Sequence, residues 1–482
     1  MVSPNSGSDC GSRLLHRHRK SWATQAILEA ALRCRPLGAP LAALLLCCTA
    51  AATGPAAAAE PTACPAPALA HLQRDNAAAA AYFTAQIGDA AAAGKAVDRA
   101  PPDAVLAERH GARGNGVADD TPALQAALAQ GRPVWLASGK VYRITRRLDL
   151  GDGAGLLSDG TATLLLAAGA EGFANTTALR SDDALYGPRG TGLRVSGRQV
   201  VLQDFFIVKD YEDERYVIGI DVRAASQVQL RRLKLRGFSL APGIVTVRSS
   251  NDVEIRGLLI HDACTASTRV PPDLPSFQIT GISIDDTRVG GLGSRRLTLA
   301  GNVIANLRML PLTPRGDQSD GINFAAIGTG QDSLISGNRI SGVDEGLDLW
   351  GDGITVLGNR VAAHSLALKL IHGAQQIVVR NNELQPGPGG RGVGIFSARP
   401  AEAQRQVHDV LIEHNRIGAG PVRRVAVHVD DSGEFPPLRV SLRHNRFDTP
   451  DCKHAALRCA APACAAADNT QQTQSGAACG RP

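Results

Sequence analysis

The chain has very few aromatic residues: 3 Trp, 5 Tyr and 10 Phe among 482 residues, or 4% of the total. Hydrophobic residues nevertheless make up 44% of the sequence, so most of the apolar surface belongs to small and branched side chains. This composition does not suit a core built around large rings. It favours stacked layers of Val, Ile and Leu joined by tight bends, for which the 51 Gly residues are well suited.

A basic tract interleaved with aromatic residues is also missing from the body of the chain. The formal net charge is +6, but many basic residues lie in the first 40 positions or are scattered among the bends of a repeat. Nucleic-acid binding would need a clustered basic patch, so we expect no nucleic-acid partner. No heptad pattern is present, and the oligomeric state, monomer or trimer, stays open.

The one long apolar run lies near the N-terminus, from Leu37 to Ala52, after a stretch rich in basic residues. A small-residue cleavage site, Ala57-Ala-Ala, follows it. We therefore predict a bacterial Sec-type signal peptide over residues 1–59, and a mature protein that is periplasmic or secreted. The run is short for a membrane span, so we expect no stable span after the signal is removed. Residues 60–104 are rich in Ala and are expected to be a linker or helical segment.

An even number of cysteines would remain after removal of the signal. An even count in an exported chain suggests disulfides, although the pairing cannot be deduced. Four of them lie within residues 451–482, a segment without a strand pattern, which we expect to be a loop-like tail held by bridges. The six cysteines are Cys64, Cys264, Cys452, Cys459, Cys464 and Cys479.

From about residue 217 to 446 the chain repeats itself, most clearly at spacings of 21 to 25 residues. Short alternating segments recur at these spacings, which indicates a coil of three short strands per turn. The spacing is too short for a propeller blade, and the frame of a leucine-rich repeat is absent. We predict an all-β fold, a parallel β-helix over residues 105–450. The aligned segments begin Gly281-Ile-Ser-Ile, Gly321-Ile-Asn-Phe, Gly346-Leu-Asp-Leu, Ala367-Leu-Lys-Leu, Gly392-Val-Gly-Ile and Ala426-Val-His-Val.

Asparagine recurs at one bend of the repeat. Asn tolerates left-handed backbone geometry, and its amide can bond to the next Asn along the coil. We therefore expect a structural ladder of Asn338, Asn359, Asn381, Asn415 and Asn445.

A helix is predicted just before the first strands. Asp120 or Thr121 can cap it, Pro122 lies in its first turn, and it would run to about Gln130. The stretch Gly111-Ala-Arg-Gly-Asn-Gly-Val-Ala-Asp-Asp-Thr-Pro-Ala-Leu-Gln-Ala-Ala resembles the opening of the pectate-lyase-like superfamily of polysaccharide-degrading enzymes and phage tailspikes. The resemblance implies a right-handed β-helix with an N-terminal capping helix. It says less about the reaction, because the superfamily holds hydrolases, lyases, epimerases and binders.

Residues at the same repeat position should form columns, because stacked strands lie about 4.8 Å apart. Counting from the aligned Gly, the first and third positions are apolar and should point inward. The second and fourth should point outward, and they mix acid, base and aromatic side chains on one face. The second position holds Asp221, Val245, Ser283, Asn323, Asp348, Lys369, Gly394 and His428; the fourth holds Arg223, Val247, Asp285, Ala325, Trp350, Ile371, Phe396 and Asp430.

Acidic residues stand just before these strands on two neighbouring turns, at Asp320 and at Asp344-Glu345. The strand spacing would bring their carboxyl groups to roughly 5–8 Å, which suits glycoside hydrolysis by paired carboxylates. Crowding would also push their pKa values apart. The alternative is that acids beside Gly only form turns and accept bonds from backbone N–H groups.

Ser319-Asp320-Gly321, followed one turn later by Asp344-Glu345, resembles the Asn-Thr-Asp-Gly and Asp-Asp motifs of the polygalacturonase branch. By that resemblance Asp344 would be the general acid, and Asp320 and Glu345 would hold and activate the water. Glu345 replaces an Asp, and His364 is out of register and lacks flanking Gly. The resemblance therefore indicates a divergent glycosidase, which would need no cofactor.

A uronate lyase or epimerase is the rival enzyme. Such an enzyme would use Ca²⁺, and Asp320, Asp344, Glu345 and Asp348 could supply its oxygen ligands. Lys369 could be the base once its pKa is lowered.

We expect five further residues to bind substrate. Trp350 could stack on a sugar, and the His and Arg residues could hold an anionic one. The five are Asp348, Trp350, His372, Arg391 and His428.

Together these features predict an exported carbohydrate-active enzyme that cleaves a polysaccharide, acidic or neutral, with glycoside hydrolysis as the leading reaction. Lyase or epimerase chemistry is the first alternative. A non-catalytic glycan-binding or cell-surface β-helix is the second. The acidic cluster separates them, since an enzyme needs Asp320, Asp344 and Glu345 to converge with Lys369 or Trp350 nearby.

Overall fold

A computed structural model describes residues 99–167, 189–209, 216–238, 241, 243–266, 278–286, 293–310, 318–326, 328–397, 406–423, 425–430, 433, 435–459 and 464–479. The predicted signal peptide at 1–59 and residues 60–98 of the Ala-rich segment lie outside this set. In the described part, no helix has the length and apolar character needed to cross a membrane.

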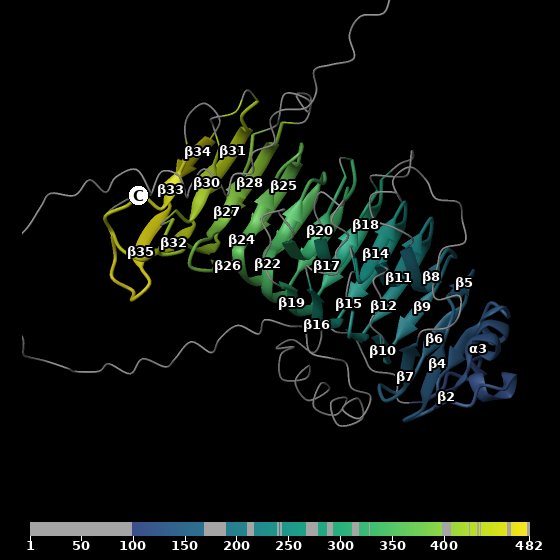
Figure 1. The fold of residues 1–482 in the computed structure, drawn as a ribbon. Coiled ribbons are helices and arrows are strands. Elements are labelled where there is room, and N and C mark those ends of the chain that lie inside the picture. Colours follow the sequence, from purple (N-terminus) through teal and green to yellow (C-terminus); the bar gives the residue numbers. More distant parts are fainter. Residues whose placement is uncertain are drawn as a thin grey trace, which may run out of the picture. The chain divides into compact units, whose positions relative to one another are not determined.

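The strands form two long sheets of 13 and 22 strands, in which each coil of the chain lies beside the next (Figure 1). The named strands pair in parallel along both sheets. Each full coil gives one strand to the smaller sheet and two strand segments to the larger one. In two coils these two segments join into single 11-residue strands, β22 and β24. The parallel β-helix predicted from the repeat is confirmed.

The strands of the 13-stranded sheet are β1 (Val105–Leu106), β3 (Pro133–Trp135), β6 (Gly155–Leu157), β9 (Val201–Gln203), β12 (Ser226–Arg231), β15 (Asn251–Arg256), β18 (Arg295–Ala300), β21 (Ser333–Ser336), β23 (Ile354–Leu357), β25 (Gln375–Arg380), β28 (His408–Glu413), β31 (Leu438–Arg443) and β34 (Cys464–Ala467).

The strands of the 22-stranded sheet are β2 (Asn115–Asp119), β4 (Val141–Ile144), β5 (Leu148–Leu150), β7 (Thr163–Leu166), β8 (Arg189–Val195), β10 (Phe206–Lys209), β11 (Tyr216–Arg223), β13 (Lys234–Arg236), β14 (Val245–Arg248), β16 (Leu259–Ala266), β17 (Gln278–Ile284), β19 (Val303–Leu310), β20 (Gln318–Phe324), β22 (Arg339–Leu349), β24 (Arg360–Leu370), β26 (Glu383–Pro386), β27 (Arg391–Ile395), β29 (Arg416–Gly418), β30 (Val427–Val429), β32 (Arg446–Thr449), β33 (Leu457–Arg458) and β35 (Thr470–Thr473).

The core is a set of apolar columns inside the coil, built from the first and third repeat positions as predicted. Each such side chain stacks on its equivalent in the next coil, and burying one Leu, Ile or Val contributes about 1.5–3 kcal/mol. One column, whose members are all fully buried, consists of Ile282, Ile322, Leu347, Leu368, Val393 and Val427.

An asparagine ladder runs along one bend. The backbone N–H and the side-chain Nδ2 of each Asn donate to Oδ1 of the next, at 2.8–3.0 Å. We predicted Asn381 as a ladder member, which was wrong, because the neighbouring Asn382 occupies the ladder. The ladder consists of Asn302, Asn338, Asn359, Asn382, Asn415, Asn445 and Asn469.

The left-handed residue at this bend is not the ladder Asn, as we expected, but the residue before it. Its positive φ turns the chain so that the following amide points into the coil. The residues with this geometry are Gly301, Gly337, Gly358, Asn381, His414, His444 and Asp468.

A helix forms in the stretch where one was predicted, as α3 (Thr121–Leu128), shorter than expected by about two residues. It follows η1 (Ala107–His110), a single 3₁₀ turn. Asp120 does not cap the helix: its carboxylate accepts bonds from the backbone N–H groups of Arg113 and Gly114. Asp119 instead accepts from the backbone N–H of Thr121 at 3.0 Å.

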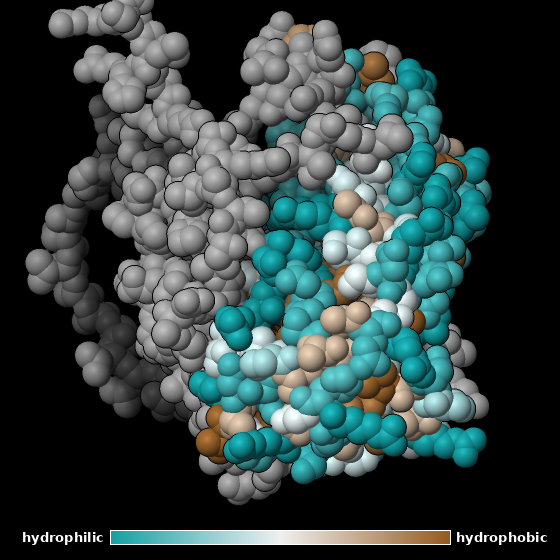
Figure 2. Space-filling view, turned by 90° about the vertical axis from the view of Figure 1, so that its right-hand side faces the viewer, coloured by the Kyte–Doolittle hydropathy of each residue, from teal (hydrophilic) through white to brown (hydrophobic). Residues whose placement is uncertain are grey.

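The inner side of α3 is apolar and packs on the core. Leu124, Ala127 and Leu128 are buried in the same hydrophobic cluster as the strands. Figure 1 shows α3 at one end of the coil, beside β2 and β4. The described surface seen from that side is mostly hydrophilic, with hydrophobic residues in scattered patches (Figure 2). That this helix closes the end of the coil stays a prediction.

The prediction of a loop-like tail over residues 451–482 was wrong. β33, β34 and β35 continue the coil by pairing with β30, β31 and β32. These segments are rich in Ala, Gln and Thr and give little strand signal, but the exposed ladder of the previous coil imposes the strand geometry.

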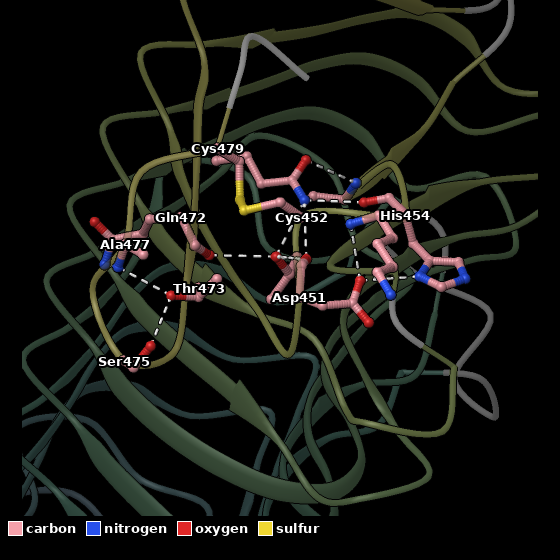
Figure 3. Close-up of a disulfide and its surroundings, with 12 residues drawn as sticks. Asp451, Cys452, His454, Gln472, Thr473, Ser475, Ala477 and Cys479 are labelled. Carbon is pink, nitrogen blue, oxygen red and sulfur yellow. Dashed lines mark hydrogen bonds and ion pairs between the residues drawn. A yellow bond between two sulfur atoms is a disulfide. The ribbon is translucent and has the colours of Figure 1, made fainter.

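Disulfide bridges do hold this last coil. Cys452 is bonded to Cys479, which lies 27 residues later (Figure 3). Cys459 is bonded to Cys464. Cys264, on β16, is disulfide-bonded as well. Bridges of this kind are typical of proteins that fold in an oxidising compartment.

The buried ladder yields a stability prediction. Asn359→Ala removes the Oδ1 that accepts from Asn338 and the Nδ2 that donates to Asn382. Because the orphaned groups stay buried, we expect a loss of about 3 kcal/mol in the free energy of unfolding, measured by urea titration. Asn381→Gly, at the exposed left-handed position, is the matched control and should change stability by less than about 0.5 kcal/mol. Equal effects of the two variants would contradict the prediction.

Candidate active site

Three neighbouring strands of the larger sheet, β20, β22 and β24, carry the predicted acidic and basic residues. Their register places Asp320 beside Glu345 and Asp348 beside Lys369. Adjacent strands lie about 4.8 Å apart, so these side chains are held close by the backbone alone. Asp344 and Glu345 lie where β22 bends from one strand segment into the next, and the register shifts between Val343 and Glu345.

The register of the predicted column at the second repeat position is largely correct, although Ser283, Asn323 and Asp348 are buried. The observed pairing runs through Ser283, Asn323, Asp348, Lys369, Gly394 and His428. One member was wrong, since Thr246 rather than Val245 pairs with Asp221. The N–H groups of Gly219 and Ile220 both donate to the carbonyl of Ile244, and this irregularity shifts that coil by one residue.

We call Asp320, Glu345 and Asp348 the carboxyl cluster. Lys369 joins two of them: its Nζ donates to Glu345 Oε2 at 2.9 Å and to Asp348 Oδ2 at 3.1 Å. Gln318 joins the other pair, since its Nε2 donates to Asp320 Oδ1 at 3.3 Å and to Glu345 Oε2 at 3.4 Å. The cluster is therefore one connected network across three coils.

Two network members were not singled out from the sequence as site residues. Asn323 donates from Nδ2 to Asp320 Oδ2 at 3.4 Å, and its own Oδ1 is buried without a hydrogen-bond donor among the described residues. Gln318 stands two residues before Asp320 on β20, so period-2 alternation brings it near the same carboxyl. The alternation could have identified Gln318, whereas only its amide orientation shows that it bridges two carboxyl groups.

Trp350 is tied to the carboxyl cluster through Asp348. The indole Nε1 donates to Asp348 Oδ1 at 3.1 Å. The ring also meets His372 edge-on, with centroids 4.3 Å apart. Asp348, which is fully buried, thus holds both the ammonium of Lys369 and the indole of Trp350.

Asp344 does not join this network, although it precedes Glu345. Its Oδ2 accepts from the backbone N–H and the hydroxyl of Ser319, at 2.9 and 3.1 Å. The hydroxyl of Ser319 in turn accepts from the Asp344 N–H at 3.0 Å. These contacts are of the turn-forming kind that we considered as an alternative, and the general-acid role of Asp344 stays a prediction.

Arg391 and His428 lie on the next coils along the sheet. Arg391 pairs with Leu366, and His428 with Gly394, which itself follows Lys369. Burial lowers the pKa of the Arg391 guanidinium, as do the neighbouring charges of Arg423 and Arg458. These two residues therefore belong to a basic region beside the carboxyl cluster rather than to its hydrogen-bonded network, and their substrate-binding role stays a prediction.

Two carboxyl groups of the cluster, those of Asp320 and Glu345, resist ionisation. Burial, reinforced by the charges of Glu345 and Asp348, raises the pKa of Asp320 well above its usual range. Burial likewise raises the pKa of Glu345 to about 7, although Lys369 acts in the opposite direction. A pKa of about 7 lets Glu345 exchange its proton readily near neutral pH, as acid–base catalysis requires.

A lyase would need a base with a lowered pKa, whereas the pKa of Lys369 is raised. Burial acts to lower its pKa, but the charges of Asp348, Glu345 and Asp320 outweigh burial and raise it. The prediction of a lowered pKa was wrong, because three carboxyl groups surround the amine and favour its charged form. Lys369 is a permanent cation in this site.

The same cation argues against the calcium set. Its ammonium is bonded to both Glu345 and Asp348, where Ca²⁺ would need their oxygens, and Asp344 faces Ser319. Among the described residues, no group of three or more His, Cys, Asp or Glu side chains is arranged to hold a metal ion.

Comparison with known proteins identifies the fold. No family model matches the chain, and no curated protein matches its sequence. The A-module of a mannuronan C-5 epimerase of Azotobacter vinelandii is similar in structure, with 16% identity, coverage of 77% of this chain and 97% of that one, and a TM-score of 0.51. The chain therefore shares the fold of this A-module.

Other right-handed β-helices resemble the chain less closely in structure. An exopolygalacturonase of Thermotoga maritima is 11% identical, with coverage of 82% of this chain and 95% of that one and a TM-score of 0.45. A surface adhesin of Streptococcus pneumoniae is 14% identical, with coverage of 77% and 90% and a TM-score of 0.44. A fold can host unrelated reactions, so the chemistry has to be argued from the site.

The raised pKa of Glu345 predicts how stability depends on pH. Folding favours the protonated side chain, so its contribution is present below the unfolded-state pKa and is lost as pH rises through about 7. Between about pH 5 and pH 8, the wild type should lose roughly 3 kcal/mol more than Glu345→Gln, which cannot ionise. Denaturant titration at each pH measures this. Glu254→Gln, an ion-paired acid on the other sheet, should follow the wild-type slope; a wild-type slope no steeper than that of Glu345→Gln would contradict the prediction.

Proposed function

We propose that this chain is an exported carbohydrate-active enzyme that hydrolyses glycosidic bonds of a polysaccharide at the carboxyl cluster. One observation carries the proposal: Asp320 and Glu345 lie on adjacent coils, share the amide of Gln318, and both have a pKa that burial raises. Hydrolysis needs such a pair, one carboxyl to protonate the leaving oxygen and one to activate water.

The proposal assigns the base to Glu345. It retains 7% exposure, whereas Asp320 is fully enclosed, and a pKa of about 7 makes its carboxylate a strong base for an attacking water at neutral pH. Asp320 supplies the proton to the leaving oxygen. Gln318 bridges the two carboxyls through long hydrogen bonds, so a bound sugar would take its place between them.

Lys369 and Trp350 support this pair. The ammonium of Lys369 stabilises the ionised form of Glu345 once its proton has left. Trp350 offers an indole face for a sugar ring, and Asp348 fixes its orientation relative to Lys369. The disulfides of the last coil are consistent with a protein that works outside the cytoplasm.

The reaction is tested with the full-length protein on a panel of neutral and acidic polysaccharides. Release of reducing ends without a product that absorbs in the ultraviolet indicates hydrolysis. An absorbing, unsaturated product indicates a lyase, and a change in sugar composition without cleavage indicates an epimerase. Binding without any conversion would mean a non-catalytic glycan-binding protein, and any of these last three outcomes overturns the proposal.

A pair of variants tests the assignment of roles. Glu345→Gln keeps the size of the side chain but removes the base, and we expect kcat to fall by a factor of about 100 or more. Asp344→Asn, one residue away and bonded to Ser319, should lower kcat by less than about tenfold, because it serves the turn. If Asp344→Asn instead abolishes activity while Glu345→Gln retains it, the general acid is Asp344, as the polygalacturonase resemblance implies.

A further inference from the structure

Three arginines lie on the coils that follow the carboxyl cluster, and we call Arg391, Arg423 and Arg458 the arginine group. Arg391 begins β27, Arg423 lies in the turn between β29 and β30, and Arg458 ends β33. The Nε of Arg423 donates at 2.9 Å to the carbonyl of Gly389, in the turn that precedes Arg391. This bond joins the turns of two neighbouring coils and fixes the base of the group.

The register of the larger sheet aligns the arginine group with the carboxyl cluster. Glu345 pairs with Leu366, and Leu366 pairs with Arg391, so Arg391 lies two coils after Glu345 in the same column. Strand spacing converts two coils into about 10 Å along the coil axis. Arg458 belongs to the neighbouring outward column, which also holds Lys369. Both columns therefore run from the carboxyl cluster to the arginine group.

The surface between the two groups is apolar. Leu366 separates Glu345 from Arg391 in their column and is partly exposed. Gly394 follows Lys369 in the other column, and the ring of Phe396 fills the space beside it, since a Cβ on Gly394 would lie 2.7 Å from Phe396 Cε2. The Phe396 side chain is also partly exposed. A leucine and an aromatic ring offer an apolar floor on which the C–H face of a sugar can pack.

The positive charge of the arginine group is not balanced within the described part of the chain. None of its three guanidinium groups forms an ion pair with a described residue. Burial lowers the pKa of Arg391, and so do the positive charges of Arg423 and Arg458, whereas the negative charge of Asp430 opposes them more weakly. These three cations are therefore close enough to repel one another, and a bound anion would relieve the repulsion.

The hydrogen bonding of Arg391 is incomplete as well. Its Nε is buried and donates to no described acceptor. Buried polar groups in folded proteins are almost always hydrogen-bonded, and an exception marks a place where a water, ion or ligand completes the set. The missing partner of an N–H donor is an acceptor, and for a guanidinium beside two like charges the best acceptor is a negatively charged oxygen.

We propose that the arginine group binds an oxyanion substituent, a carboxylate or a sulfate ester, on the polysaccharide whose bond is broken at the carboxyl cluster. The inference rests on the proposed function, since it places both groups on one bound chain. Arg391 donates to the oxyanion through its guanidinium, and the exposed side chains of Arg423 and Arg458 add positive charge from the two following coils.

This arrangement fixes how the substrate lies. The bound chain runs along the coil axis from the carboxyl cluster toward the later coils, and it crosses Leu366 and Phe396 on the way. A neutral chain can use the apolar floor, but only an anionic chain gains from the arginines. The arginine group therefore selects acidic polysaccharides over neutral ones of the same length.

Calorimetric titration of the full-length protein with defined oligosaccharides tests the inference. The probes are a uronate, a sulfated and a neutral hexasaccharide, each with sulfur in place of the glycosidic oxygens so that hydrolysis does not interfere. Arg391→Gln should raise Kd for one of the two anionic probes about tenfold or more, because a charge-assisted hydrogen bond is lost. Its Kd for the neutral probe should not change. The anionic probe that responds identifies the substituent as carboxylate or sulfate.

Two further variants guard against an effect of folding or of overall charge. Arg458→Gln removes an exposed side chain, so the fold is kept, and it should raise Kd for the same anionic probe about threefold. Arg256→Gln is the matched control, because Arg256 pairs with Glu254 at 2.7 Å on the other sheet and its loss removes the same charge from a different face.

Three results would overturn the inference. They are an unchanged Kd for both anionic probes in Arg391→Gln and Arg458→Gln, an equal loss of anionic binding in Arg256→Gln, and a wild type that binds neither anionic probe. Glu345→Gln separates this test from the proposed function, since it should lose turnover and keep binding. If Glu345→Gln stays active while Arg391→Gln weakens anionic binding, the arginine group stands and the proposed function fails.

Discussion

The parallel backbone ladder between successive coils is the constraint on which every other feature depends. It holds each residue about 4.8 Å from its equivalent in the next coil, and the buried columns of Ile, Leu and Val keep it closed. Side chains on the outward columns cannot move apart to relieve repulsion. Asp320, Glu345 and Asp348 are therefore held close together. The pKa values of Asp320 and Glu345 are raised, and the Lys369 cation bonds to Glu345 and Asp348.

Much of this arrangement could be predicted from the repeat. Once the Gly-aligned segments are placed in register, the pairing of Asp320 with Glu345 and of Asp348 with Lys369 follows from counting residues. The Asn ladder follows in the same way, except where two asparagines adjoin and only the geometry of the bend selects Asn382 over Asn381. The placement of Val245 in the outward column was wrong for a related reason. One irregular coil shifts the residue count by one, so Thr246 pairs with Asp221.

What could not be predicted depends on the direction of individual side chains. Sequence places Asp344 and Glu345 side by side, but the bend in β22 sends one carboxylate to Ser319 and the other to Lys369. The direction of the Lys369 pKa shift likewise depends on three carboxyl groups that approach its amine from two other coils. The last coil was not predicted, because its Ala, Gln and Thr residues have low strand propensity. They adopt strand geometry by pairing with the neighbouring coil.

The first and last described coils are held by different kinds of contact. At the C-terminal end, bridges between Cys452 and Cys479 and between Cys459 and Cys464 are covalent, whereas α3 packs on the first coils through apolar contacts. A solenoid loses its structure by unzipping from a free end, coil by coil, because each coil contacts only its neighbours. The covalent bridges of the last coil therefore oppose fraying at the C-terminal end. The coils that carry Asp320, Asp348 and Lys369 stand well inside both ends, and would be among the last to come apart.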